Sequence, residues 1–258
     1  MLRKLRRAAE KASGLAFQLI GWPRHPCECP VCQRPVRRWV PLERDVGAER
    51  RRNEGEGRLC PHCLSFERTR HFWLWLEQEG VLGRRPRFLH FAPEAGLERR
   101  LRPLFGEAYV TADLFMAGVD RRLDLTRLEL PDGSFDFIYC SNVLEHIPDD
   151  RAAMRELHRV LAPGGTAVVQ VPIRGEVTYE DPSITDPAER ARHFGQADHV
   201  RYYGRDIRER LAEAGFQVRE LVMLDVLRLG PGDVMRWNLD KREYLHLCVR
   251  PEGGLAAV

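Results

Sequence analysis

Two pairs of cysteines offer the first recognisable chemistry in this sequence. Cys29 and Cys32 form one Cys-Pro-x-Cys unit, and Cys60 and Cys63 form a second. Two thiolates three positions apart on a tight turn can hold one metal ion, and two such turns together provide the tetrahedral sulfur site that Zn²⁺ prefers. We therefore predict a zinc ion held by these four cysteines.

The same region leaves other ligands and other uses open. Cys27 or His62 could replace one of the four ligands. A redox Cys-x-x-Cys pair is expected beside a strand–helix unit, which this region lacks, and a catalytic zinc would keep one coordination position open. Cys140 and Cys248 lie in apolar, strand-like stretches and are expected in the core. A structural zinc, which would supply most of the folding free energy of so small a module, is the favoured interpretation.

A second group of polar residues follows predicted strands. Asp113 ends the second strand, roughly 20 residues after the turn at His90–Gly96 that ends the first. An acid at this place can accept hydrogen bonds from the ribose hydroxyls of a nucleotide-type cofactor. The spacing therefore favours a cofactor site at the ends of the strands.

The elements that must position these residues alternate between strand and helix. We predict strands at 87–92, 108–114, 121–125, 135–141, 166–171, 216–227 and 243–249, and helices at 65–80, 96–105, 149–161 and 205–214. Pro163-Gly164-Gly165 is expected to stop the third helix. Such alternation predicts an α/β fold with a doubly wound, mostly parallel seven-stranded sheet, whose ligand lies at the carboxyl ends of the strands. Three regions are expected: a basic segment with a zinc-ribbon-like module (1–64), a linking helix (65–85) and a Rossmann-like domain (86–258).

At this point the sequence resembles the class I (Rossmann-like) S-adenosylmethionine-dependent methyltransferases. The likeness is closest over residues 123–171, where FDFI, VLEHI, ELHRVL and PGG follow one another in the order typical of that superfamily. It extends over roughly Phe88 to Val249. VLEH and PGG together are specific to the superfamily but not to one substrate.

The resemblance implies a cofactor site for S-adenosylmethionine. Asp113 would bind the ribose, Asp124 and the Leu125 backbone would contact the adenine, and Ser141 and Asn142 would border the cofactor and the methyl-transfer position. The full set of expected cofactor-binding residues is His90, Ala92, Glu94, Gly96, Asp113, Leu114, Asp124, Leu125, Ser141 and Asn142.

The loop after the first strand departs from the superfamily pattern. His90 occupies the place of an acid, and Ala92 and Glu94 occupy places where glycines are usual, whereas Gly96 matches the last glycine. Glycines let the backbone approach a ligand closely, so this loop must take another path or leave more room. Glu94 could instead hold the amino group of the cofactor. The alternative is that the altered loop binds the cofactor weakly or not at all. We favour a functional cofactor site because the ribose, adenine and fourth-strand positions fit the superfamily pattern.

The stretch from Val171 to Gly204 is expected to form a lid or substrate wall. It contains two histidines and several tyrosines, which suit proton transfer to or from an acceptor. His199 is the first candidate for a catalytic base or substrate hydrogen-bond partner, and His193 is the second. The alternative is that His199 and Arg201 only fasten the loop to the sheet, because alignment alone suffices for many methyltransferases of this type.

Composition and charge narrow the classes of partner. Hydrophobic residues make up 43% of the 258 residues and charged residues 31%, as in a folded cytoplasmic protein, and no apolar run approaches the roughly 20 residues of a membrane span. Residues 1–58 carry a net charge of +7, whereas the whole chain carries +3. The basic residues within 1–21 are interpreted as a solvated helix or a frayed terminus, with a helix that binds an anionic membrane surface or nucleic acid as the alternative.

Three functions follow from these patterns. The favoured one is methyl transfer to a small-molecule acceptor. The second is methylation of RNA or protein, with the basic zinc module and Arg50–Arg52 as the docking element, although no recognised RNA motif is present. The third is a non-catalytic cofactor-binding or interaction protein. The sequence leaves the oligomeric state open.

Overall fold

The computed structural model describes residues 27–40, 58–239 and 243–252. The basic helix expected within 1–21 and the Arg50–Arg52 docking element lie outside the described residues. Among the described helices, none is long and apolar enough to cross a membrane.

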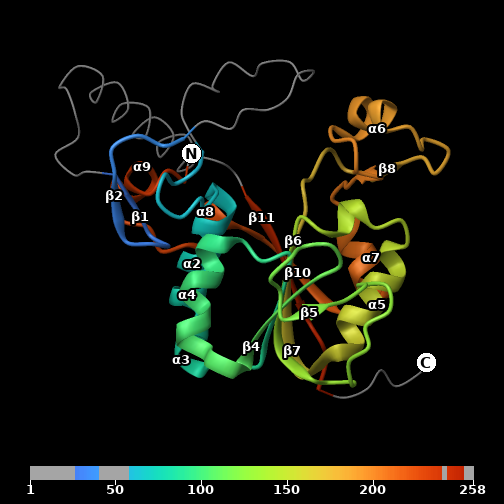
Figure 1. Cartoon of the computed structure of the whole chain (residues 1–258), viewed down its shortest axis with the longest axis horizontal. Coiled ribbons are helices and arrows are strands. Elements are labelled where there is room, and N and C mark those ends of the chain that lie inside the picture. Colours follow the sequence, from blue (N-terminus) through green and yellow to red (C-terminus); the bar gives the residue numbers. More distant parts are fainter. Residues whose placement is uncertain (1–26, 41–57, 240–242, 253–258) are drawn as a thin grey trace, which may run out of the picture.

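A seven-stranded sheet forms the centre of the molecule (Figure 1). Its strands are β3 (Phe88–Phe91), β4 (Tyr109–Asp113), β5 (Arg121–Arg122), β6 (Phe135–Ser141), β7 (Leu161–Gln170), β10 (Gln217–Val222) and β11 (Tyr244–Val249), in the order β10-β11-β7-β6-β3-β4-β5. Neighbouring strands from β5 to β7 are parallel, whereas β11 is antiparallel to both β7 and β10. The predicted doubly wound, mostly parallel sheet is confirmed.

Helices cover both faces of this sheet because its strands bury side chains on both sides. In β3, Phe88 belongs to the core on one face and Leu89 to the core on the other, as the two-residue period of a strand requires. Figure 1 shows α2 (Glu67–Gln78), α3 (Val81–Arg84) and α4 (Ala95–Phe105) on one face, and α5 (Asp150–Val160) and α7 (Ile207–Glu213) on the other.

Local sequence signals explain where α5 begins and ends. The Asp149 side chain accepts a hydrogen bond from Ala152 N (2.9 Å) and so caps the first turn. Ala153, Leu157 and Val160 are fully buried at helical spacing. Leu161 is already extended, so the helix ends before the Pro-Gly-Gly turn, which lies within β7 rather than between the two elements.

Two strands are shorter than expected. The strand predicted over 216–227 ends at Val222, and a short helix, α8 (Met223–Val226), follows it. The reason is the partner strand: β11 begins at Tyr244, which pairs with Val222, so residues after Val222 face no strand of the sheet. The strand predicted over 121–125 is reduced to Arg121–Arg122, which pair with the end of β4.

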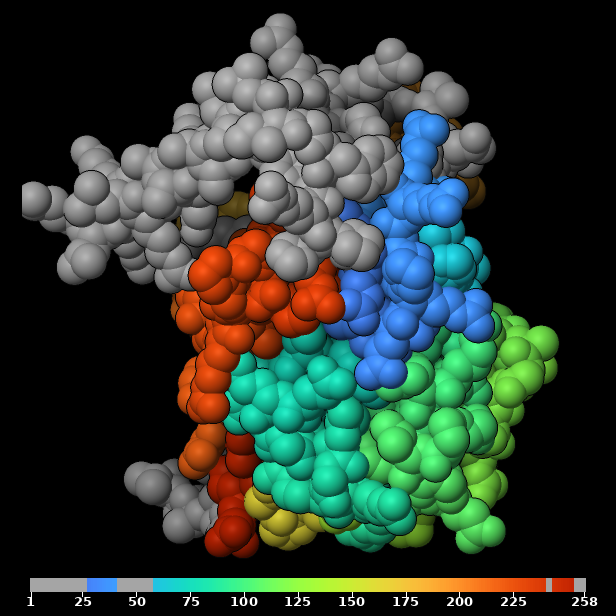
Figure 2. All heavy atoms as spheres, turned by 90° about the vertical axis from the view of Figure 1, so that its left-hand side faces the viewer, coloured from blue at the N-terminus to red at the C-terminus, as the bar shows by residue number. Residues whose placement is uncertain are grey.

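The residues that carry the cysteine pairs pack onto the same face as α2. β1 (Cys27–Cys29) and β2 (Arg34–Val36) form an antiparallel hairpin, and Val40 pairs with Leu59. The hairpin contacts α9 (Asp233–Arg236), where Arg236 forms an ion pair with Glu28. Figure 2 shows residues 27–40 (blue) against the segment that contains α9 (orange-red).

The stretch predicted as a lid has structure of its own. It contains a short ribbon of β8 (Tyr179–Glu180) and β9 (Arg201–Tyr202), with α6 (Pro187–Phe194) between them. The Arg201 guanidinium is buried and donates to the carbonyls of Leu144 (3.2 Å) and Pro148 (2.8 Å). These bonds fasten the ribbon to the segment that follows β6.

Candidate metal, cofactor and acceptor sites

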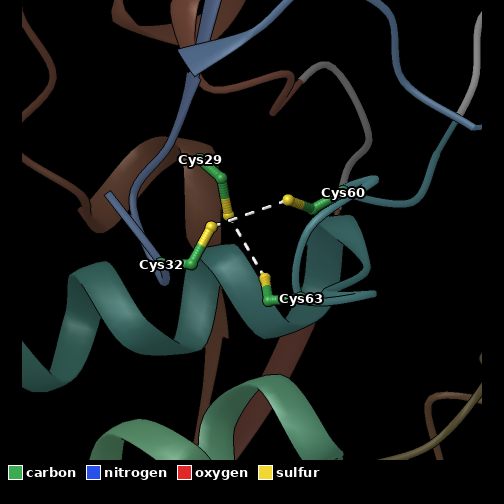
Figure 3. Close-up of side chains that lie close together, drawn as sticks. All are labelled: Cys29, Cys32, Cys60 and Cys63. Atoms are coloured by element: carbon green, nitrogen blue, oxygen red, sulfur yellow. Dashed lines mark hydrogen bonds between the residues drawn. The ribbon is translucent and has the colours of Figure 1, made fainter. Parts of the chain in front are cut away.

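The four cysteines of the two pairs lie together (Figure 3). The Cys29 and Cys63 sulfurs are 3.7 Å apart, as are those of Cys32 and Cys60, and all four are free thiols. Four sulfurs at this separation can surround one ion at the roughly 2.3 Å of a zinc–sulfur bond. The geometry is therefore compatible with the zinc module.

The two alternative ligands lie outside this cluster. The Cys27 sulfur faces the Met235 carbonyl (3.8 Å), and the exposed His62 ring meets the Pro35 carbonyl through Nε2 (3.1 Å). Of the described residues, only Cys29, Cys32, Cys60 and Cys63 form the sulfur group.

The surroundings of the cysteines suit a cation with thiolate ligands. Burial, followed by the Coulombic effect of Cys29, raises the pKa of the Cys32 thiol to about 11, so a thiolate here needs a positive partner. Zinc with four thiolates carries a net charge of −2, and the fully buried Arg70 supplies a positive charge nearby. Its guanidinium donates to the carbonyls of Arg58 (3.1 Å), Ser65 (2.8 Å) and Asn238 (2.9 Å).

The second cysteine pair lies directly against the expected cofactor loop. A Cβ on Gly96 would come within 2.6 Å of the Cys63 carbonyl oxygen, so only glycine fits at this contact. Arg68, five residues after Cys63, reaches Glu94 at 3.7 Å. The sequence suggested that Gly96 serves the cofactor. What the structure shows is that Gly96 lets the turn at Cys63 approach the start of α4.

The loop after β3 has a glycine-like bend without a glycine. Ala92 adopts a φ of 47°, in the left-handed region that favours glycine. Glu94 precedes the first residue of α4, and its carboxylate accepts a hydrogen bond from His90 Nε2 (3.1 Å), while His90 Nδ1 meets the Tyr109 hydroxyl (2.6 Å). Burial favours a higher Glu94 pKa, but the hydrogen bond from His90 and the charge of Arg68 outweigh it, so the pKa is lowered and the carboxylate is charged.

Asp113 lies at the carboxyl end of β4, as predicted. Its Oδ1 accepts hydrogen bonds from the backbone N–H groups of Phe115 and Met116 (2.7 Å each). Its Oδ2 makes no hydrogen bond to the residues that the structure describes. Leu114 and Phe115, the next residues, are exposed, with 82% of Phe115 accessible. A carboxylate oxygen beside exposed apolar groups fits a ribose next to a flat base.

Asp124 and Leu125 differ in accessibility. Leu125 is buried in the core, whereas Asp124 is exposed and its Oδ1 accepts from Thr126 N (2.8 Å) and Thr126 Oγ1 (2.7 Å). These bonds to Thr126 lower the Asp124 pKa. Any contact of Leu125 with adenine must therefore use its backbone, as the sequence suggested.

The end of β6 contributes Ser141 and Asn142. Ser141 is buried, and its hydroxyl donates to Gln170 Oε1 (3.3 Å) at the end of β7. Asn142 adopts a φ of 54°, and its backbone N–H donates to the Gln170 carbonyl (2.8 Å). The chain thus turns sharply at Asn142 where two parallel strands end side by side.

The two candidate histidines lie in different environments. His193, on α6, is exposed and meets the Tyr179 hydroxyl through Nδ1 (2.8 Å). His199 is only 2% exposed, and its Nδ1 meets the Phe194 carbonyl (3.0 Å). The His199 ring lies 4.6 Å from that of His146, edge to face. The structure therefore brings His199, but not His193, to the segment after β6.

Glu145 is a residue whose importance the sequence analysis missed. It is only 1% exposed, and neither carboxylate oxygen makes a hydrogen bond of good geometry with the residues that the structure describes. Burial raises its pKa to about 7, with smaller opposing effects from its own backbone and Asn142. The VLEH motif was the sequence feature that could have pointed to Glu145. It marked this segment but did not show that the carboxylate is buried.

A family model and a curated protein each match part of this chain. The family described as "Methyltransferase domain" matches residues 67–221. An uncharacterized 37.1 kDa protein in a transposon of Streptomyces fradiae is 32% identical over 102 residues, which are 38% of this chain and 29% of that protein. The match thus spans less than a third of this relative's length.

The solved structures that this chain resembles are distant from it in sequence. An S-adenosylmethionine-dependent methyltransferase from Mesorhizobium loti is 19% identical, with a TM-score of 0.41, over 66% of this chain and 95% of that one. A phosphoethanolamine N-methyltransferase from Haemonchus contortus, in complex with S-adenosylmethionine, is 17% identical, with a TM-score of 0.45, over 69% of this chain and 53% of that one.

Proposed function

The chain belongs to the methyltransferase domain family, and from that premise we propose that it transfers the methyl group of S-adenosylmethionine to an acceptor molecule. The observation that carries the proposal is the meeting of three strand ends. The loops after β3, β4 and β6 leave the same edge of a parallel sheet, where ligands of such folds bind. When bound, the cofactor supplies an electrophilic methyl group on a sulfonium.

We assign the cofactor contacts by position. Asp113 would accept hydrogen bonds from the ribose hydroxyls through Oδ2. Asp124 and the Leu125 backbone would contact the adenine. The loop from His90 to Gly96, with Leu114, would complete the site, and Ser141 and Asn142 would border the methyl group. Glu94 is charged and already paired with His90 and Arg68. An amino group of the cofactor would therefore have to share the Glu94 carboxylate with these two side chains.

We propose a small molecule as the acceptor. The lid ribbon supports this choice, since Val200 N donates to the Glu145 carbonyl (2.9 Å) and Arg201 fastens the ribbon over the end of β6. A segment held in this way would exclude water from the site and favour an acceptor that fits beneath it. We propose His199, rather than His193, as the histidine on the acceptor side of the site, because its ring lies beside that of His146 in the segment that follows β6.

Calorimetric titration with S-adenosylmethionine and S-adenosylhomocysteine tests the proposal. We expect micromolar binding of both. If neither binds to folded, zinc-loaded protein, the methyltransferase assignment fails and the non-catalytic alternative takes its place. Binding would justify a screen of acceptors with methyl-labelled cofactor.

A further inference from the structure

Glu145, His146 and His199 come together from two separate segments. Glu145 and His146 belong to η2 (Leu144–His146), the short turn that follows β6, and His199 precedes β9 in the lid ribbon. One possible ligand atom from each residue lies within 4.8 Å of the others. We propose that these three residues bind a divalent metal ion on the acceptor side of the site, an inference that rests on the proposed function.

The buried carboxylate is the first observation that points to a ligand. The Glu145 carbonyl accepts a hydrogen bond from Val200 N, yet within the described part of the chain neither of its carboxylate oxygens makes a hydrogen bond of good geometry. A buried polar group without such a partner is costly and rare in folded proteins. A divalent cation would provide the missing partner.

The hydrogen bonds of the two histidines are the second observation. His199 Nδ1 meets the Phe194 carbonyl, which can only accept, so Nδ1 carries the hydrogen and Nε2 the lone pair. His146 Nδ1 lies 3.2 Å from Asp198 Oδ2, and the same tautomer follows. Metal-binding histidines typically donate their other ring N–H to a carbonyl or carboxylate in this way.

The ligand set indicates the kind of metal. Two imidazoles and one carboxylate suit divalent ions of the first transition row, such as Mn²⁺, Fe²⁺, Co²⁺ and Zn²⁺. Ligand atoms on opposite sides of an ion, each about 2.1 Å from it, are about 4.2 Å apart. The three ligand atoms here lie within 4.8 Å of one another, so small side-chain movements would bring them to an ion. Three protein ligands leave positions for water or for an oxygen of the acceptor, such as a hydroxyl.

Binding of Mn²⁺ to tag-free full-length protein that holds one zinc per chain by elemental analysis, the amount that the cysteine cluster accounts for, tests the site. Thiolates favour softer ions, so Mn²⁺ should not compete for the cysteine cluster. The decrease in the electron paramagnetic resonance signal of free Mn²⁺ measures how many ions are bound. We expect about one per chain, and at least a tenfold loss of affinity in Glu145→Gln and His199→Gln. Glu213→Gln and His158→Gln, which change the same residue types outside the cluster, should leave Mn²⁺ affinity unchanged.

Calorimetry with S-adenosylhomocysteine on the same samples separates this inference from the proposed function. Both site variants should retain wild-type affinity for S-adenosylhomocysteine, which also shows that they are folded. If the wild type binds S-adenosylhomocysteine but no Mn²⁺, or if both site variants bind Mn²⁺ like the wild type, the metal site is refuted and the methyltransferase assignment stands. If the wild type binds Mn²⁺ but no S-adenosylhomocysteine, the methyltransferase assignment fails instead.

Discussion

His90 lies one residue before the end of β3 and Asp113 ends the neighbouring strand β4, but their side chains have different surroundings. His90 is fully buried between Tyr109 and Glu94, and both ring nitrogens have partners. Asp113 is partly exposed, and one of its oxygens is used only to hold the following turn. At the residue scale, His90 therefore shapes the cofactor loop from within, whereas Asp113 can contact a ligand.

Replacing Asp113 with Asn should weaken binding of S-adenosylhomocysteine by roughly ten- to a hundredfold. The amide oxygen can still cap the turn, but the charged acceptor for the ribose hydroxyls is lost, and hydrogen bonds to charged groups contribute about 1.5–3 kcal/mol. Calorimetric titration measures the change. Asp181→Asn is the matched control, because Asp181 also accepts local bonds through Oδ1, from Ser183. Equal affinity in Asp113→Asn and wild type would remove Asp113 from the site.

His71 should make the protein sensitive to acid. It is fully buried in α2, and burial lowers its pKa to about 4 from the ordinary 6.5. Between these two pKa values the unfolded chain binds a proton at His71 and the folded chain does not. The free energy of unfolding therefore falls as the pH falls from about 6.5 to 4. At pH 5 the loss attributable to this residue is about 2 kcal/mol.

Urea denaturation at pH 7 and pH 5 tests the role of His71. The free energy of unfolding should fall less between the two pH values in His71→Leu than in the wild type. His193→Gln, a change at an exposed histidine, should show the wild-type fall. An identical fall in all three proteins would contradict the assignment.

At the scale of elements, the start of α4 connects the two candidate sites. Gly96 touches the Cys63 carbonyl, and Glu94 reaches Arg68, which follows the same cysteine turn. The turn that carries Cys63 thus packs against the loop that would hold the cofactor. Zinc binding and cofactor binding should therefore depend on each other.

Replacing Gly96 with Ala should loosen this contact. The new Cβ would meet the Cys63 carbonyl at 2.6 Å, so the turn must shift, at a cost of about 1–3 kcal/mol. We expect a lower free energy of unfolding and faster zinc loss to a chelator with a coloured zinc complex. Gly83→Ala is the control, because a Cβ at Gly83 of α3 would meet no atom of the described residues within 4 Å. Wild-type zinc loss in Gly96→Ala would show that the contact does not support the cluster.

At the scale of the whole molecule, the cysteine cluster and the sheet share one core. Cys29, Val31 and Cys63 belong to the same buried cluster as Phe72 of α2 and Phe88 of β3. The proposed division into 1–64, 65–85 and 86–258 therefore describes the order of parts along the chain, whereas the core joins the described residues of all three.

Removal of zinc should destabilise the entire protein. We expect about one zinc per purified chain by elemental analysis, and a single thermal transition whose Tm falls when a chelator removes the metal. An independent module would give a different result: the main transition would keep its Tm while a smaller one disappeared. Fully folded protein without zinc would refute the metal assignment itself. Differential scanning calorimetry distinguishes these outcomes.

Sequence alone determined the alternation of elements and placed Asp113 and Ser141 at the ends of strands. Periodic apolar residues and the two cysteine pairs act locally, so their consequences can be read from short stretches of sequence. The ends of β10 and β5 could not be predicted in this way. A strand extends only as far as its neighbour does, and the register with β11 and β4 is a property of the folded sheet.

Tertiary structure alone decided which residues meet. Glu145 and His199 are more than fifty positions apart, and only the docking of the lid ribbon buries the carboxylate beside the imidazoles. In the same way, Gly96 was expected from sequence to serve the cofactor, and folding placed Cys63 against it. Residue types and local spacing specify what chemistry is available, whereas burial and long-range contact specify which groups share a site, because both depend on segments that are distant along the chain.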